Sequence, residues 1–347
     1  MERLKLLELA SSIAVPMALR AAIILDVFEI INKASPREPI SAKDVIVHIP
    51  ANTTKSIDYL DRILKLLATR EILSETIVEV DGKKESRYGL TPLSKYLIKD
   101  EMGMSMAPLV VLIQHQAFMA SWQYLPDAVL DGGDPFFKAH SKNAFQLGAE
   151  DPHFNKLGKS AMGAYSTLFI KATLDAYDGF KDISKLVDVG GGMGSSLNMI
   201  LSRYPHIQGV NFDLPHVVAD APQYPSVKHV GGNMFESVPT GEAILIKSVL
   251  HNWSDDNCVT ILKNCYKSLP KAGKAIVVDA VLHATVDHSL AAKVNCSMDL
   301  VTLAYSQGGR QRTEQNFKDL AIAAGFAGIK VICTVDSYSI LEFYKVF

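Results

Sequence analysis

The sequence predicts an α/β protein. Its C-terminal part is a doubly wound, Rossmann-like domain, and a mostly helical N-terminal domain with a winged-helix pattern precedes it. Three observations lead to this prediction. From Lys185 onward, apolar strands alternate with helical segments, as in a mostly parallel sheet. The first strand runs into a glycine-rich turn, the usual start of a ligand site in such sheets. Residues 41–100 instead alternate helices with one hairpin.

The N-terminal 34 residues are apolar at helical spacing from Leu4 to Ala34. Pro16 interrupts the pattern, so we expect two helices with a break there. The segment is too apolar for a lone surface helix, so it is either core of its own domain or buried by a second copy of the chain. Because so short a segment has little else to cover it, dimerisation is a good hypothesis.

The winged-helix pattern follows this segment. Ser41 is expected to cap a helix, and 77–80 and 87–90 are expected to pair across a turn at Asp81-Gly82, with three helices before the hairpin and one after it. Many winged helices bind DNA, but residues 41–100 hold 10 Lys/Arg against 9 Asp/Glu. A protein that binds duplex DNA should have a basic face, and this charge balance does not indicate one. We therefore expect no nucleic-acid partner.

The remaining chain divides into a connector and a sheet domain. We place the boundaries at 1–100, 101–180 and 181–347, with the connector mainly helical and rich in Met, Phe and Leu. Strands are expected at 186–189, 208–212, 227–230, 243–247, 275–279, 330–334 and 339–344. Ligands of such sheets bind at the C-terminal ends of the strands.

The composition describes an ordinary globular protein, with 48% hydrophobic residues, 21% charged residues and a net charge of -2. The four cysteines show no C-x-x-C spacing, so we expect reduced thiols, no metal site and a cytoplasmic location. We find no signal-peptide pattern and no stretch long enough to span a membrane, so no membrane partner is expected.

The glycine-rich turn indicates the cofactor. Reading from Gly190, the pattern is G-x-G-x-G, and Ser195 stands where a dinucleotide fingerprint has its third glycine. Asp213 ends the next strand and can accept both hydroxyls of a ribose. A cofactor with an adenosine but no pyrophosphate fits this pattern, and S-adenosylmethionine is such a cofactor.

Motifs along the whole chain resemble those of the plant caffeic-acid-type O-methyltransferases. They are VDVGGG at 187–192, NFDLPHV at 211–217, HVGGNMF at 229–235, LHNWS at 250–254, LKNCY at 262–266 and GGRQRT at 308–313. The resemblance implies S-adenosylmethionine as methyl donor, S-adenosylhomocysteine as product, a small aromatic acceptor, an interlocked homodimer and no metal.

The resemblance also assigns roles to residues. It implies that the cofactor is held by Gly190, Asp213, Leu214, Asn233, Met234, Lys247 and Ser166. It implies an acceptor pocket lined by Phe118, Phe154, Met162, Ser248, Met298, Val301, Thr302 and Ser306, with Ser11 reaching the pocket of the partner subunit. Gly158 and Ser248 stand where the family commonly has aromatic residues, so we expect a larger or differently shaped pocket.

His251 matches the family's catalytic base, and a histidine suits proton removal near neutral pH. The residues around it depart from the family in one direction. Asn252 replaces the Asp of the usual His-Asp pair, Gln311 replaces a supporting Glu, and Asp279 is shorter than the usual Glu. An imidazolium would meet less negative charge, so we expect a weaker base. Restoring carboxylates at 252 and 311 is expected to speed phenol methylation if charge is limiting.

These observations leave three functions open. The first is O-methylation of a phenolic specialised metabolite, such as a phenylpropanoid or an alkaloid phenol. The second is N-methylation of an aromatic or arylalkyl amine, whose lone pair needs less help from a base. The third is a partner subunit that binds cofactor and ligand without transferring methyl.

Overall fold

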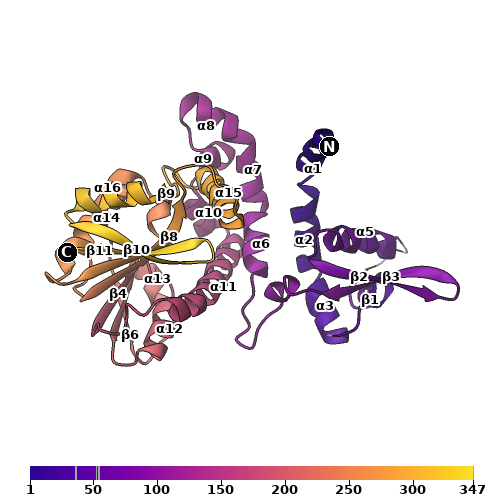
Figure 1. Cartoon of the computed structure of the whole chain (residues 1–347), viewed down its shortest axis with the longest axis horizontal. Helices are drawn as coiled ribbons and strands as arrows, with labels where there is room; N and C mark the ends of the chain where they lie inside the picture. The colour runs from indigo at the N-terminus through magenta and orange to yellow at the C-terminus, as the bar shows by residue number, and fades with distance from the viewer. Residues whose placement is uncertain (36, 52, 54, 347) are drawn as a thin grey trace. The chain divides into compact units, whose positions relative to one another are not determined.

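The computed structural model describes the chain except residues 36, 52, 54 and 347 and the side chain of residue 145 (Figure 1). The chain folds into two compact units. The first comprises Met1–Gln116 and His153–Tyr165, and the second comprises Ala117–Pro152 and Ser166–Phe347. The segment 101–180 that we predicted as a connector therefore contributes to both units.

The first unit begins with three helices, whereas the sequence predicted two. They are α1 (Glu2–Ala10), α2 (Ala14–Ile24) and α3 (Val27–Ala34). Pro16 does not mark the break, because it lies in the first turn of α2, where a missing N–H costs no helical hydrogen bond. The second break lies at Asp26, which adopts a left-handed φ of 55°.

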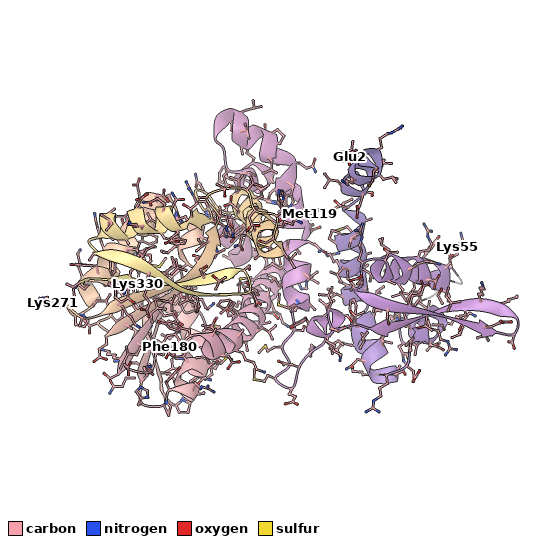
Figure 2. All side chains as sticks on the ribbon, in the orientation of Figure 1. Glu2, Lys55, Met119, Phe180, Lys271 and Lys330 are labelled. Carbon is pink, nitrogen blue, oxygen red and sulfur yellow. The ribbon has the colours of Figure 1, made fainter. Side chains whose placement is uncertain are left out.

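Helix α1 is the most exposed apolar element of this unit. None of its residues is buried, and Leu4, Leu6, Leu7 and Leu9 are all at least 63% exposed. Figure 2 shows its side chains, with Glu2 labelled, projecting on all sides of the helix. No single helix among the described residues is long and apolar enough to cross a membrane, although α1 and α2 together pass that test as a bent pair.

The winged-helix part contains β1 (Ile40–Ser41), α4 (Ala42–Ile46), α5 (Ser56–Ala68), β2 (Leu73–Val80), β3 (Lys83–Leu90) and the 3-10 helix η1 (Ser94–Leu97). The strands form an antiparallel sheet in the order β1-β3-β2. Ser41 caps α4 in a capping box with Asp44, and Asp81 and Gly82 form the hairpin turn, both as predicted. Among the described residues from 41 to the hairpin there are two helices, α4 and α5, where the sequence predicts three.

The helical stretch between the winged-helix part and the large sheet comprises α6 (Ala107–Ile113), α7 (Gln116–Ser121), η2 (Trp122–Tyr124), α8 (Leu125–Asp131), α9 (Pro135–His140), α10 (Ala144–Glu150) and α11 (Pro152–Ala176). Helix α11 is 25 residues long and has residues in both units.

The second unit is built on one large sheet (Figure 1). Its strands are β4 (Lys185–Val189), β5 (Gln208–Asp213), β6 (Val227–Gly231), β7 (Ala243–Lys247), β8 (Lys274–Leu282), β10 (Gly328–Val335) and β11 (Tyr338–Tyr344), with the short β9 (Arg312–Thr313) beside β8. All seven predicted strands are present, and β9 was not predicted. The order is β10-β11-β8-β7-β4-β5-β6, parallel from β8 to β6.

This order positions the site. The chain builds β4, β5 and β6 outward in one direction and then returns to place β7 on the other side of β4. The C-terminal ends of β4 and β7 therefore flank the point where the strand order reverses, which is where doubly wound sheets bind ligands. The helices of this unit after α11 are α12 (Ser195–Arg203), α13 (Pro215–Ala219), η3 (Leu250–Asn252), α14 (Asp255–Ser268), α15 (Leu290–Tyr305) and α16 (Glu314–Ala324).

Candidate active site

The turn after β4 leaves open space beside its backbone. Gly190, Gly192 and Gly194 have φ values of +71°, +57° and +77°, and residues with a side chain rarely adopt this backbone region. A Cβ atom on Gly192 would meet nothing within 4 Å, whereas one on Gly190 would lie 2.8 Å from Val249. The turn is therefore packed on one side and open at Gly192, as a cradle for a ligand requires.

Asp213 closes this turn at the end of β5. One carboxylate oxygen accepts a hydrogen bond from the Gly192 N–H at 2.8 Å, and the other accepts from the Leu214 N–H at 2.7 Å. Each oxygen has a second lone pair, so the carboxylate can still accept two hydroxyl groups.

Below the turn lie two ionisable side chains that interact electrostatically, the buried Asp188 and the half-buried Lys247. Asp188 is 1% exposed, and burial raises its pKa to about 7 although the Lys247 charge opposes this. Burial likewise lowers the pKa of Lys247, whose Nζ donates to the Ser166 hydroxyl at 2.8 Å. One oxygen of Asp188 has no hydrogen-bond partner among the described residues. The turn thus has a spare acceptor and a cation beneath it.

The loop after β6 is held by its own side chains. Asn233 accepts from the Phe235 N–H at 3.0 Å and donates to Glu236 at 2.9 Å. The Asn264 amide donates to the Met234 carbonyl at 2.9 Å, which ties this loop to α14. The amide side chain of Asn233 therefore donates and accepts hydrogen bonds within its own loop.

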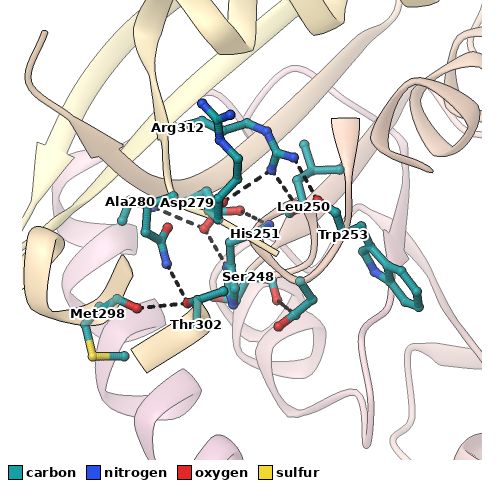
Figure 3. A network of polar contacts seen from close by, with 12 residues as sticks. Ser248, Leu250, His251, Trp253, Asp279, Ala280, Met298, Thr302 and Arg312 are labelled. Carbon is teal, nitrogen blue, oxygen red and sulfur yellow. Dashed lines mark hydrogen bonds and ion pairs between the residues drawn. The ribbon is translucent and has the colours of Figure 1, made fainter. Parts of the chain in front are cut away.

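His251 lies on η3, just beyond the C-terminal end of β7 (Figure 3). Its Nδ1 lies 2.7 Å from Oδ1 of Asp279, and its backbone N–H donates to Oδ2 of the same residue at 3.2 Å. Asp279 is 1% exposed, on β8, and also accepts from the Ala280 N–H at 3.1 Å. The short side chain thus reaches the ring. Because a carboxylate can only accept, the neutral form of the ring carries its proton on Nδ1 and has its lone pair on Nε2.

Asn252 connects this turn to α15. Its Oδ1 accepts from the Tyr305 hydroxyl at 3.0 Å, and its Nδ2 donates to the Ser248 carbonyl at 3.3 Å. The Ser306 hydroxyl donates to the Asn252 carbonyl at 2.8 Å. Ser248 adopts a left-handed φ of 56°, which is strained for a residue with a side chain. Asn252 therefore contacts neighbouring elements rather than the imidazole.

Gln311 lies in the same region but contacts other residues. Its backbone N–H donates to Asp299 at 2.7 Å, and its Nε2 lies 3.4 Å from the Thr302 hydroxyl, which donates to the Met298 carbonyl. It is 3% exposed, and its Oε1 has no partner in the described part of the chain. No hydrogen bond between Gln311 and His251 or Asp279 is found among the described residues.

Arg312 is a site residue that the sequence did not reveal. It is fully buried and donates to the carbonyls of Leu250 and Trp253 at 2.8 and 2.7 Å, one on each side of His251 (Figure 3). Its guanidinium also contacts Asp255 at 2.7 Å. Its only signal in the sequence is its place in the GGRQRT motif, directly after Gln311.

The predicted acceptor residues fall into two groups. Phe118, Ser248, Met298, Val301, Thr302 and Ser306 belong to the second unit, and Ser11, Phe154 and Met162 belong to the first. Within the second unit the Phe118 ring packs edge-on against Tyr305, at 5.5 Å between centroids. Within the first, Phe154 packs against His115 at 5.0 Å, and a Cβ on Gly158 would meet nothing within 4 Å.

Comparison with known proteins identifies the family. A family model described as the O-methyltransferase domain matches residues 122–327, and the O-methyltransferase dimerisation domain matches residues 7–100. The chain belongs to the O-methyltransferase family. Caffeic acid 3-O-methyltransferase of Prunus dulcis is 47% identical to this O-methyltransferase over 340 residues, which cover 98% of the chain and 93% of the relative. O-methyltransferase 13 of Lophophora williamsii is 46% identical and covers 95% and 91%.

Solved structures agree with this fold. CalO1, a methyltransferase in calicheamicin biosynthesis in its SAH-bound form, is 26% identical with a TM-score of 0.84, covering 99% of this chain and 98% of its own. Human N-acetylserotonin methyltransferase in complex with SAM has a TM-score of 0.85 at 20% identity, covering 100% and 98%. This O-methyltransferase is an S-adenosylmethionine-dependent enzyme, and the open cradle at Gly192 beside the Asp213 carboxylate fits that cofactor.

Proposed function

We propose that the enzyme transfers the methyl group of S-adenosylmethionine to a hydroxyl of a small phenol, with His251 as general base. The observation that carries this proposal is the double attachment of His251 to Asp279, through the ring Nδ1 at 2.7 Å and the backbone N–H at 3.2 Å. It fixes both the tautomer and the direction of the ring. The remaining lone pair on Nε2 is then available for a proton.

The chemistry requires such a group. A phenol has a pKa of about 10, so little phenolate exists at neutral pH without a base. The bound cofactor supplies an electrophilic methyl group. Nε2 of His251 takes the phenolic proton as the oxygen attacks, and Asp279 stabilises the resulting imidazolium.

We propose cofactor roles for the residues around the glycine-rich turn. The backbone at Gly190 lies against the methionine part, and Asp213 takes the two ribose hydroxyls. Leu214, Asn233 and Met234 flank the adenosine, and the Lys247–Ser166 pair lies beneath the turn. Support comes from the free lone pairs of Asp213 and from the open space at Gly192.

For the acceptor we propose a phenylpropanoid or a related aromatic with a phenolic hydroxyl. The relatives named caffeic acid 3-O-methyltransferase support this class. Gly158 and Ser248, in place of larger residues, support an acceptor bulkier than a simple hydroxycinnamate. The six predicted acceptor residues of the second unit then line its acceptor pocket.

We further propose that two copies form a homodimer in the cytoplasm. The dimerisation domain at 7–100 and the exposed leucines of α1 support the dimer, because a second copy would cover that apolar surface. All four cysteines are free, which fits a reducing compartment.

A direct experiment tests the reaction. Purified enzyme is incubated with labelled S-adenosylmethionine and with phenols and amines that are matched in shape. We expect label on oxygen. Label on nitrogen alone would favour the second candidate, N-methylation, which the amides at 252 and 311 support because an uncharged amine needs no proton removed before it attacks. Cofactor binding without product would refute both.

A further inference from the structure

We propose that Arg312, held by Asp255, is a positioning residue that sets the place of His251. The inference rests on the proposed function, because it concerns the residue that we assign as base. Arg312 itself contacts neither the cofactor nor the acceptor in this proposal. Its effect passes through the backbone of the turn that carries the imidazole.

The hydrogen bonds of that turn show how the positioning works. Nη1 of Arg312 donates to the Leu250 carbonyl at 2.8 Å, and Nη2 donates to the Trp253 carbonyl at 2.7 Å. These carbonyls come before and after His251, at the two ends of the 3-10 turn. Both carbonyls accept from this one side chain, and the Leu250 carbonyl also accepts from the Trp253 N–H and from the Cys258 thiol, each at 3.2 Å. The planar fork of Arg312 fixes the distance between the two carbonyls.

Asp255 fixes the guanidinium in turn. Its Oδ1 accepts from Nε at 2.9 Å and from Nη2 at 2.7 Å. Arg312 is fully buried, while the Asp255 side chain is 54% exposed. A buried cation is stable only when it is paired and hydrogen-bonded, so this cation is restricted to the one place where its counterion and both carbonyls meet.

The position of His251 is therefore fixed from two sides. Asp279 on β8 orients the ring, and Arg312 on β9 holds the backbone around it. A lysine at position 312 keeps the charge, but its single ammonium cannot reproduce the fork that holds two carbonyls and a carboxylate. A shift of about 1 Å in a catalytic group can cost a hundredfold in rate.

The experiment compares Arg312→Lys and Asp255→Asn with Asp256→Asn. Asp256 is the matched control, because it lies in the same first turn of α14, is exposed, and has no ion pair among the described residues. Turnover is expressed per site that binds S-adenosylhomocysteine in calorimetry, so that misfolded protein does not count. Each variant is assayed with an ordinary phenol and with a nitrophenol that is already ionised at the assay pH.

We expect Arg312→Lys to lose about ten- to a hundredfold in turnover on the ordinary phenol and much less on the ionised one, because only the first needs the base. Asp255→Asn should show the same pattern with a smaller loss, and Asp256→Asn should match the wild type. Equal losses on both phenols, or none, would overturn the inference. If Arg312→Lys does not fold, Asp255→Asn decides alone.

His251→Ala separates this inference from the proposed function. It should show the same dependence on acceptor acidity, with a loss of about two to four powers of ten on the ordinary phenol. If it does not, the proposed base is wrong. If His251→Ala shows that dependence and the Arg312 and Asp255 variants do not, the base stands and the positioning role fails.

Discussion

Replacing Asp279 with Asn tests the contact on which the proposed base depends. The carboxylate accepts from the His251 ring and from the Ala280 N–H through one oxygen, and from the His251 N–H through the other. An asparagine has only one oxygen. In either orientation its NH2 group faces a backbone N–H, and in one of them it also faces the ring and forces the proton onto Nε2.

The expected losses follow from these contacts. A backbone N–H left unsatisfied in this buried site costs about 1–3 kcal/mol of stability. Losing a charged acceptor for the imidazolium costs about 1.5–3 kcal/mol in the transition state, or about ten- to 150-fold in rate. Together with the wrong tautomer, we expect turnover on a phenol to fall by about two to three powers of ten.

The assay compares kcat on an ordinary phenol with the dissociation constant for S-adenosylhomocysteine, which should stay unchanged. Asp279→Glu is the control, since it keeps the carboxylate and adds one methylene. It should cost about 1–3 kcal/mol in stability through overpacking while keeping most of the activity. If Asp279→Asn retained half or more of the wild-type turnover, the base would not depend on this carboxylate and our reasoning would be refuted.

Three further predictions concern the surroundings of the site. Gly192→Ala should weaken S-adenosylhomocysteine binding in calorimetry by about tenfold or more, because the added methyl group enters the space beside the turn. Gly82→Ala is the control, because Gly82 also has a left-handed backbone and open space at its Cβ position. It should lower stability by a similar amount without changing the affinity for S-adenosylhomocysteine. Burial raises the pKa of Asp188 to about 7 in the folded protein, so the unfolded chain releases this proton at lower pH than the folded one. The free energy of unfolding of the wild type, measured in denaturant titrations, should therefore fall relative to that of Asp188→Asn as the pH rises from about 4 to 7. A difference in free energy between the two proteins that does not change with pH would contradict this. Asn252→Asp should lower the free energy of unfolding by about 1–3 kcal/mol in urea titrations, because a carboxylate oxygen would replace the amide donor beside the Ser248 carbonyl. An unfolding midpoint equal to or higher than that of the wild type would argue against this contact.

Much of the fold follows from local pattern. The seven strands were predicted because each is an apolar run bounded by turn residues, and the structure extends them by at most a few residues. The N-terminal helices show the limit of such reasoning. Pro16 signals a helix end as readily as a helix start, and the left-handed Asp26 at the second break has no distinctive neighbour in the sequence.

The site divides in the same way. The positions of His251 and Asp279 near the C-terminal ends of two neighbouring strands, together with the LHNWS motif, indicate that they lie close together. The C-terminal ends of adjacent parallel strands lie at the same edge of the sheet. The direction of a side chain is set by packing. The sequence therefore does not indicate that Gln311 donates to the Thr302 hydroxyl or that Asn252 accepts from the Tyr305 hydroxyl. The expectation that acids at 252 and 311 speed phenol methylation if charge is limiting rests on charge alone and does not include these partners, and it stays a prediction.

The contacts of Arg312 with the turn at 250–253 join two stretches that lie about sixty positions apart in the sequence. When the enzyme is redesigned, Arg312 must keep its position in space relative to the turn at 250–253. An inserted or deleted residue between Ser306 and Arg312 would displace the guanidinium from its carbonyls even if every catalytic side chain were retained. Changes of loop length are better placed around residues 283–289, whose side chains are mostly exposed. Homologous loops grafted at 306–312 should therefore be exchanged together with the segment that carries the histidine.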